Sequence, residues 1–133
     1  MIDIFNKVYT NIKNALATDY PDVFISGEKL NVVSELPCVS VVEADNSFYL
    51  DSLDSSEKEL HAQIMYEVEV YSAKTFKKKT EARNIFKVID DEFRRMGFVR
   101  TMANAVDNIE PDIYRFVGRF EAIVGDDEIT YRR

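Results

Sequence analysis

Residues 61–72 constrain the fold most strongly, because apolar and polar side chains alternate along this segment. One side is apolar and consists of Ala62, Ile64, Tyr66, Val68 and Val70. The other side carries polar residues that include His61, Gln63, Glu67 and Glu69. Successive side chains of a strand point to opposite faces of a sheet, so this pattern predicts a strand with one buried and one solvated face. Strands of this kind are typical of antiparallel sheets.

Residues 80–97 instead repeat their apolar positions at the three- and four-residue spacing of an amphipathic helix. The apolar stripe contains Ala82, Ile85, Phe86, Ile89, Phe93 and Met96. Gly97 is the residue type favoured just beyond a helix end, and Arg94 and Arg95 complement the helix dipole in the last turn. The segment therefore predicts a helix that packs one side on a sheet.

A second amphipathic helix is predicted near the start of the chain, between Asp3 and Asp19. Asp3 suits the N-cap position, and Pro21 disfavours the helical conformation in the residue before it. The apolar side of this helix contains Phe5, Val8, Tyr9, Ile12 and Leu16.

Four further segments have the apolar and β-branched composition of strands: 23–25, 37–42, 98–103 and 113–124. In the longest of them, one face is formed by Tyr114, Phe116, Gly118, Phe120, Ala122 and Val124. The turn-forming residues 108–112 separate the last two segments, which we therefore expect to form a hairpin.

These elements predict an α+β fold in which two amphipathic helices pack on a mainly antiparallel sheet of about four to five strands. The chain has 133 residues and contains no low-complexity segment, so we expect a single domain over 1–133. Residues 44–60 are acidic and contain serine, which indicates an exposed loop. Residues 126–133 are expected to form a short C-terminal tail.

Composition excludes several classes of function. A net charge of −7 disfavours nonspecific nucleic-acid binding, which draws its affinity from Lys and Arg. A single cysteine, Cys38, rules out an internal disulfide and suits a reducing compartment. No apolar stretch approaches the roughly 20 residues of a membrane span, and the first residues lack the pattern of a signal peptide, so we expect a soluble protein without a membrane partner.

The sequence offers little support for catalysis or a cofactor. Cys38 lies in an apolar run and His61 on the polar side of another strand, positions that favour structural roles. Asp112 and Glu121 have the spacing of a magnesium nuclease, but Ile123 stands where that chemistry needs a lysine. The four glycines are too scattered for a phosphate-binding loop. We therefore expect that the chain is not an enzyme and that it binds neither a metal nor a cofactor.

Three charged clusters are interpreted as solvated surface. The lysines at 77–79 precede the second predicted helix, the carboxylates at 90–92 lie within it, and those at 126–128 form a turn. None of the three predicts a binding site.

With the residues from Gly97 to Val124, Tyr114-Arg115-Phe116-Val117-Gly118-Arg119-Phe120 among them, the C-terminal half resembles small structural proteins of Firmicutes prophages, of the kind that end phage tails. The resemblance is most specific over Gly97 to Val124 and includes Asn108-Ile109 and Tyr114-Arg115-Phe116-Val117-Gly118-Arg119-Phe120-Glu121-Ala122-Ile123-Val124. It extends loosely to Phe93-Arg94-Arg95-Met96, the strand after Pro37, Glu67-Val68-Glu69-Val70-Tyr71 and Tyr131-Arg132-Arg133. The chain is thus similar to tail terminators, also called tail-completion proteins.

The resemblance implies a hexameric ring, a homo-oligomer that caps the tail tube, stops its growth and offers a joining surface to the head. Implied partners are the tail tube protein, the sheath protein if the tail is contractile, and a neck or head-completion protein. DNA is implied only as passing cargo. The expected location is the virion or a phage-tail-like particle, after assembly in the host bacterial cytoplasm.

The family has no catalytic residues to transfer to this sequence. The candidate contact residues between neighbouring subunits are therefore chosen mainly by their charge. The interaction candidates are Asp45, Asp51, Asp54, Glu57, Arg115, Arg119, Tyr131, Arg132 and Arg133. We expect the acidic loop to face the channel, because carboxylates repel passing phosphates. The basic candidates are expected to meet acidic partners in neighbouring subunits.

Two other classes of function stay open. One is a head-completion or adaptor ring elsewhere in the neck, and the other, with weaker support, is a small magnesium-dependent phage nuclease. Loss of metal-dependent cleavage on changing Asp112 and Glu121 would identify the nuclease.

Overall fold

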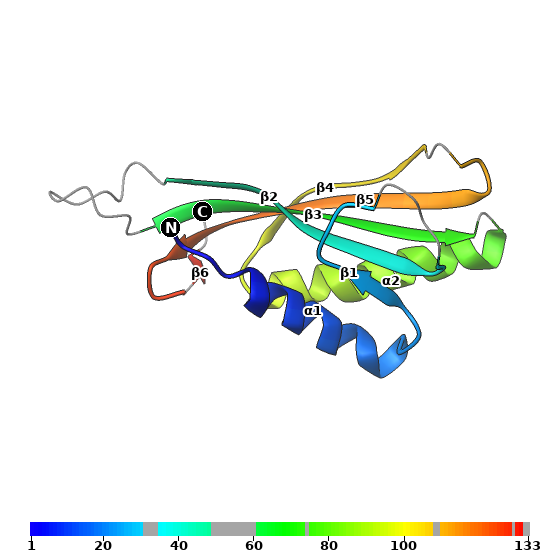
Figure 1. Ribbon diagram of the computed structural model, residues 1–133, viewed down its shortest axis with the longest axis horizontal. Helices are drawn as coiled ribbons and strands as arrows, with labels where there is room; N and C mark the ends of the chain where they lie inside the picture. The colour runs from blue at the N-terminus through cyan, green and yellow to red at the C-terminus, as the bar shows by residue number, and fades with distance from the viewer. Residues whose placement is uncertain (31–34, 49–60, 74, 108–109, 129, 132–133) are drawn as a thin grey trace, which may run out of the picture.

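The computed structural model describes residues 1–30, 35–48, 61–73, 75–107, 110–128 and 130–131. Within these residues the chain forms two helices, α1 (Phe5–Asp19) and α2 (Phe76–Arg95). It also forms six strands: β1 (Phe24–Ser26), β2 (Cys38–Phe48), β3 (His61–Ala73), β4 (Val99–Val106), β5 (Ile113–Gly125) and β6 (Thr130–Tyr131). Both helices lie on the same side of one sheet (Figure 1), which confirms the predicted α+β fold.

The sheet has the strand order β1-β2-β3-β5-β4, and β6 pairs with β5 beside β4. All neighbours are antiparallel except β1 and β2, which run parallel. The centre is the long pair β3 and β5, which stay in register from His61 opposite Gly125 to Ala73 opposite Ile113. The predicted hairpin is confirmed by the pairing of β4 with β5.

The core fills the space between the two helices and the sheet. On β3, the predicted apolar side is fully buried, and Tyr66 at its centre packs against the rings of Phe93 and Phe98. On α2, the whole predicted stripe is buried except Met96, which is partly exposed. Gly97 has a φ of +92°, a left-handed conformation that glycine adopts without strain, and it ends the helix as predicted.

Both helices begin differently from the prediction. Ile4, not Asp3, occupies the N-cap position of α1, although a carboxylate oxygen of Asp3 accepts a hydrogen bond from the Phe5 amide at 3.1 Å. Helix α2 begins at Phe76 instead of Thr80, so the lysine run at 77–79 lies in its first turn and not in a preceding loop. Lysine is a good helix former, and the unfavourable position of its charge near the helix start costs less than about 1 kcal/mol per residue.

The acidic segment is the main correction to the predicted fold. Strand β2 does not stop at Val42 but continues to Phe48, five residues into the expected acidic segment. Over this extension β2 remains paired with β3, with Asn46 opposite Ile64, after a bulge between Glu43 and Asp45. Residues 49–60, the rest of the predicted loop, lie outside the described residues.

The predicted tail is also partly a strand. In β6, Thr130 pairs with Val124 and Tyr131 with Ile123 of β5, so the chain returns to the sheet after the acidic turn at 126–128. Arg132 and Arg133 lie outside the described residues.

Tyr66 provides a test of the packing. Its hydroxyl is fully buried, and the described residues offer it no hydrogen-bond partner; burial accordingly raises its pKa. A buried polar group without a partner costs stability, so Tyr66→Phe should leave the free energy of unfolding unchanged or raise it by up to about 2 kcal/mol.

Tyr71→Phe is the matched control, because the Tyr71 hydroxyl donates a hydrogen bond to Glu69. We expect this variant to lose about 1–3 kcal/mol, since the acceptor is a carboxylate. Chemical denaturation measures both changes. A loss above about 1 kcal/mol in Tyr66→Phe would show that its hydroxyl is satisfied in solution.

Candidate interaction surface

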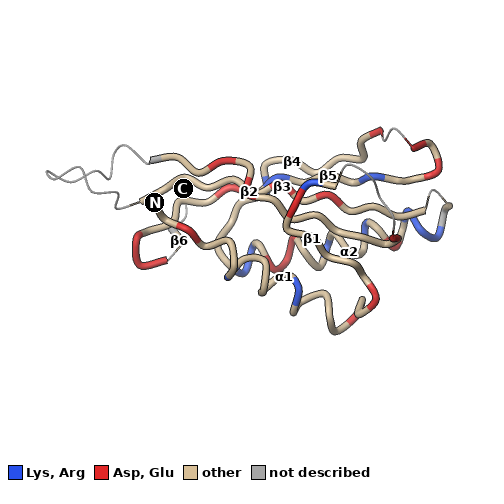
Figure 2. The backbone as a smooth tube through the Cα atoms, in the orientation of Figure 1, with Lys and Arg blue, Asp and Glu red and all other residues tan. Residues whose placement is uncertain are grey.

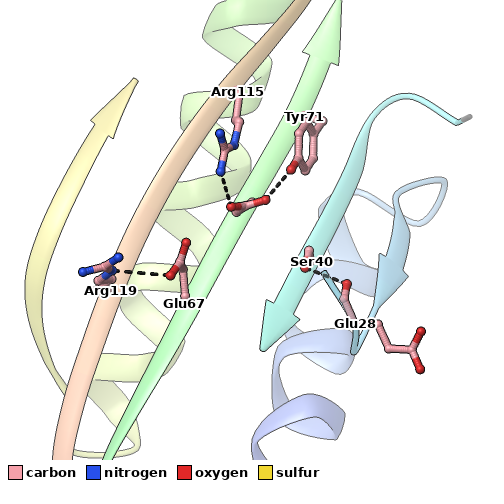
Figure 3. A network of polar contacts seen from close by, with 7 residues as sticks. Glu28, Ser40, Glu67, Tyr71, Arg115 and Arg119 are labelled. Carbon is pink, nitrogen blue, oxygen red and sulfur yellow. Dashed lines mark hydrogen bonds and ion pairs between the residues drawn. The ribbon is translucent and has the colours of Figure 1, made fainter. Parts of the chain in front are cut away.

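The face of the sheet opposite the helices carries a network of charged side chains (Figure 3). Alternation along β3 places Glu67, Glu69 and Tyr71 on this face, and the register with β5 sets Glu67 opposite Arg119 and Tyr71 opposite Arg115. The central strands therefore bring opposite charges together across the ladder, an arrangement that stabilises neighbouring strands.

Glu69 is the centre of this network and is only 3% exposed. Its carboxylate accepts hydrogen bonds from the Tyr71 hydroxyl and from the Arg115 guanidinium. Burial opposes ionisation of Glu69, but the hydrogen bonds from Tyr71 and Arg115 and the charge of Arg115 outweigh it and lower the pKa of this carboxyl. Glu69 is thus a buried anion held by a cation, and removal of either partner would leave the other without its counter-charge.

A second pair lies closer to solvent. The Arg119 Nε lies 3.4 Å from a carboxylate oxygen of Glu67, and the Arg119 side chain is 46% exposed. Exposed pairs of this kind contribute at most about 1 kcal/mol. Arg115 and Arg119, two of the four arginines predicted to meet neighbouring subunits, therefore have an acidic partner in their own chain, and of these two only Arg119 presents much of its side chain to solvent.

A small hollow lies beside this network. It is lined by Lys29, Ser40, Val42, Ala44, Glu67 and Glu69 and encloses about 50 Å³. Pockets for organic ligands measure roughly 300–1,000 Å³, so this hollow holds no more than a few water molecules. Ser40 closes one side by donating a hydrogen bond of 2.8 Å to the carbonyl of Glu28.

The two edges of the sheet are open within the described residues. On one side, β1 pairs only with residues 38–40 of β2, so residues 41–48 of β2 have no outer strand partner. On the other side, β4 is the edge strand over its length Val99–Val106. Each side also exposes a large apolar side chain, Phe24 of β1 at 43% and Val99 of β4 at 49%.

A cleft of about 340 Å³ lies where α2 leads into β4. Its polar wall is an acidic side chain between two basic ones: Asp90 is 3.1 Å from the Arg94 guanidinium and 3.2 Å from that of Arg100. Asp90 is nearly buried, whereas both arginines are exposed. The cleft therefore carries a net positive charge and orients two guanidinium groups beside the exposed Val99.

The sequence patterns did not predict this cleft. The spacing of Asp90 and Arg94 is that of a helical ion pair and was available as a signal. Arg100 comes close to Asp90 because the chain reverses its direction at Gly97. This contact is visible only in the three-dimensional structure.

The other predicted interaction residues are scattered. Asp45 is exposed on β2, opposite Met65, and Tyr131 lies in β6 opposite Ile123. Asp51, Asp54, Glu57, Arg132 and Arg133 lie outside the described residues. Of the candidates that the structure describes, Arg115 and Arg119 form ion pairs with Glu69 and Glu67, neither of which was predicted as an interaction residue.

The geometry disfavours the proposed nuclease pair. Asp112 precedes the first residue of β5, and Glu121 lies nine positions further along the same extended segment. At about 3.3 Å per residue the two are roughly 30 Å apart and cannot share a metal ion. In the described part of the chain, no group of three or more His, Cys, Asp or Glu side chains is placed to hold a metal.

Cys38 is buried in a second apolar cluster with Tyr71 and Ile113, against which Leu30 packs. Burial, together with the charge of Glu35, raises the pKa of its thiol to about 12. A thiol that stays protonated at neutral pH is a poor nucleophile. The structural role predicted for Cys38 fits this environment.

No model of a known protein family matches the sequence, and no curated protein is significantly similar to it. Among the described residues, no helix is long and apolar enough to cross a membrane.

Proposed function

We propose that this chain is the subunit of a closed ring that caps the tail tube of a phage or phage-like particle, a tail terminator. The observation that carries the proposal is the pair of unlike open edges on opposite sides of the sheet, each with an exposed apolar side chain, Phe24 on one and Val99 on the other. Open strand edges are surfaces that pair with other chains unless they are covered.

Unlike surfaces on opposite sides of one subunit favour head-to-tail contacts. Such heterologous contacts generate a ring when the rotation closes. The charges agree with this, because Asp45 lies on the β2 side and Arg100 on the β4 side. Figure 2 shows acidic residues on β2 and basic residues along β5, the strand beside β4, although the turn before β6 on that side is acidic as well.

The paired arginines suit a wall along which DNA slides. A cation binds DNA by releasing counterions from phosphates, and it is less available when a carboxylate already neutralises it. Arg115 and Arg119 are both neutralised in this way, by Glu69 and Glu67. Its arginines are neutralised and the whole chain has a net charge of −7, so the helix-free face is suited to line a channel that does not retain DNA.

A tube-growth assay tests the proposed function. Tail tube protein from the same phage is allowed to polymerise with and without the purified chain, and tube lengths are measured by negative-stain electron microscopy. We expect tubes to stop growing and to carry an extra ring at one end when the chain is present.

The control is heat-denatured protein at the same concentration. Unchanged tube lengths together with a ring bound to an isolated head connector would identify a neck adaptor instead. Unchanged lengths without any bound ring would contradict the proposal.

A further inference from the structure

We propose that neighbouring subunits join by pairing the outer edge of β2, residues 41–48, with β4 of a second copy, Val99–Val106, so that the sheet continues across the subunit boundary. This inference rests on the proposed ring and names the contact that closes it. The occupant of each open edge is thus another copy of the same chain.

Strand direction supports the pairing. Because β2, β3, β5 and β4 are neighbours in that order and each pair is antiparallel, β4 runs opposite to β2. A rotation about a ring axis that roughly follows the strands leaves these directions unchanged from one copy to the next. The meeting of β4 with the next β2 is therefore antiparallel, the arrangement that is slightly more stable per residue than a parallel one.

The two edges match in length. Each offers eight residues, and neither contains a proline or a lysine, the residues that often block edge pairing. Each strand has one bulge, between Glu43 and Asp45 in β2 and between Arg100 and Met102 in β4. Bulges bend a strand and increase its twist, which suits a sheet that curves around a closed ring.

Charge distinguishes this pairing from its alternatives. Residues 41–48 contain Glu43 and Asp45 and no basic residue, whereas β4 contains Arg100 and no acidic one. In the antiparallel arrangement, the Phe48 end of β2 lies against the start of β4, where the cleft with Arg94 and Arg100 opens. Two β4 edges facing each other around a two-fold axis would instead bring Arg100 and its symmetry copy to the same edge.

Cysteine cross-linking tests the contact. Ala44 of β2 and Asn104 of β4 are both exposed on the helix-free face, since Ala44 lines the hollow beside Glu67 and Glu69 and Asn104 is opposite Val117. Antiparallel pairing of residues 41–48 with residues 99–106 sets Ala44 opposite Ala103 of the next copy, beside Asn104. Ala44→Cys and Asn104→Cys are made separately, then co-expressed and treated with a short bismaleimide, whose length tolerates a register shift of two residues. The wild-type chain is the control, because Cys38 is buried with a pKa of about 12.

We expect a covalent dimer when the two variants assemble together and none when either is treated alone. The variant that carries both cysteines in one chain should give a ladder that ends at the number of subunits in the ring. Dimers formed by Asn104→Cys alone would overturn the inference in favour of a β4–β4 contact. If electron microscopy shows an intact ring but no cross-link forms, this contact is wrong and the ring proposal still stands. If the chain stays monomeric, both proposals are wrong.

Discussion

Replacing Phe86 by alanine should lower the free energy of unfolding by about 3–5 kcal/mol, the usual cost of deleting a large aromatic side chain from a core. Phe86 is 4% exposed, and its ring lies 4.8 Å from that of Phe116 and 5.9 Å from that of Phe120, measured between centroids. It therefore joins α2 to the centre of β5. Urea denaturation measures the change, and a loss below about 1 kcal/mol would contradict this packing.

Gly118 provides the matched control for Phe86. A Cβ added at Gly118 would overlap the tip of the Phe86 ring, so Gly118→Ala should destabilise the wild-type protein by about 1–3 kcal/mol. In the Phe86→Ala background this clash is gone, and the same substitution should cost much less. Equal costs in the two backgrounds would show that Phe86 and Gly118 do not touch.

Replacing Glu69 by glutamine should cost about 2–4 kcal/mol, because it leaves the partly buried Arg115 without its counter-charge. The Glu69 side chain is 4% exposed and that of Arg115 21%, so water compensates little of the loss. Glu67→Gln is the control on the same strand face. Its partner Arg119 is 46% exposed, so this variant should lose less than about 1 kcal/mol.

The cost of Glu69→Gln should also depend on pH. Because the pKa of Glu69 is lowered in the folded protein, its stabilisation is fully present above its ordinary pKa of 4.5 and is lost as the pH falls through the folded value. The difference in unfolding free energy between wild type and Glu69→Gln should therefore be largest near neutral pH and smaller at about pH 3. A difference that stays constant over this range would mean that the charge of Glu69 contributes nothing.

Local patterns were enough to predict the elements that have one buried side. The alternation on β3 and the stripe on α2 report directly which side faces the core, and both are buried as predicted. The same alternation placed Glu69 in solvent, which is wrong. Cys38, Ile113 and Leu30 gather with Tyr71 on that face, and a contact between distant segments leaves no mark on the period of one strand.

The length of β2 is a second case in which contacts between distant segments override a local sequence pattern. Glu43 and Asp45 have low intrinsic preference for strands, so the sequence indicated a loop after Val42. Pairing with β3 outweighs that preference, and it buries Val41 in the core. Likewise, the helix end, Gly97 and the following strand were each predicted from local patterns, but the contact of Asp90 with Arg100 across the turn was not.

Native mass spectrometry of the purified chain tests the central claim, that this protein works as a closed ring, most directly. A closed hexameric ring should give one dominant species with the mass of six copies of the 15.4-kDa chain, and no open-ended series of larger masses. A chain that remains a 15.4-kDa monomer at every concentration, or that stops at a two-fold dimer, would contradict it.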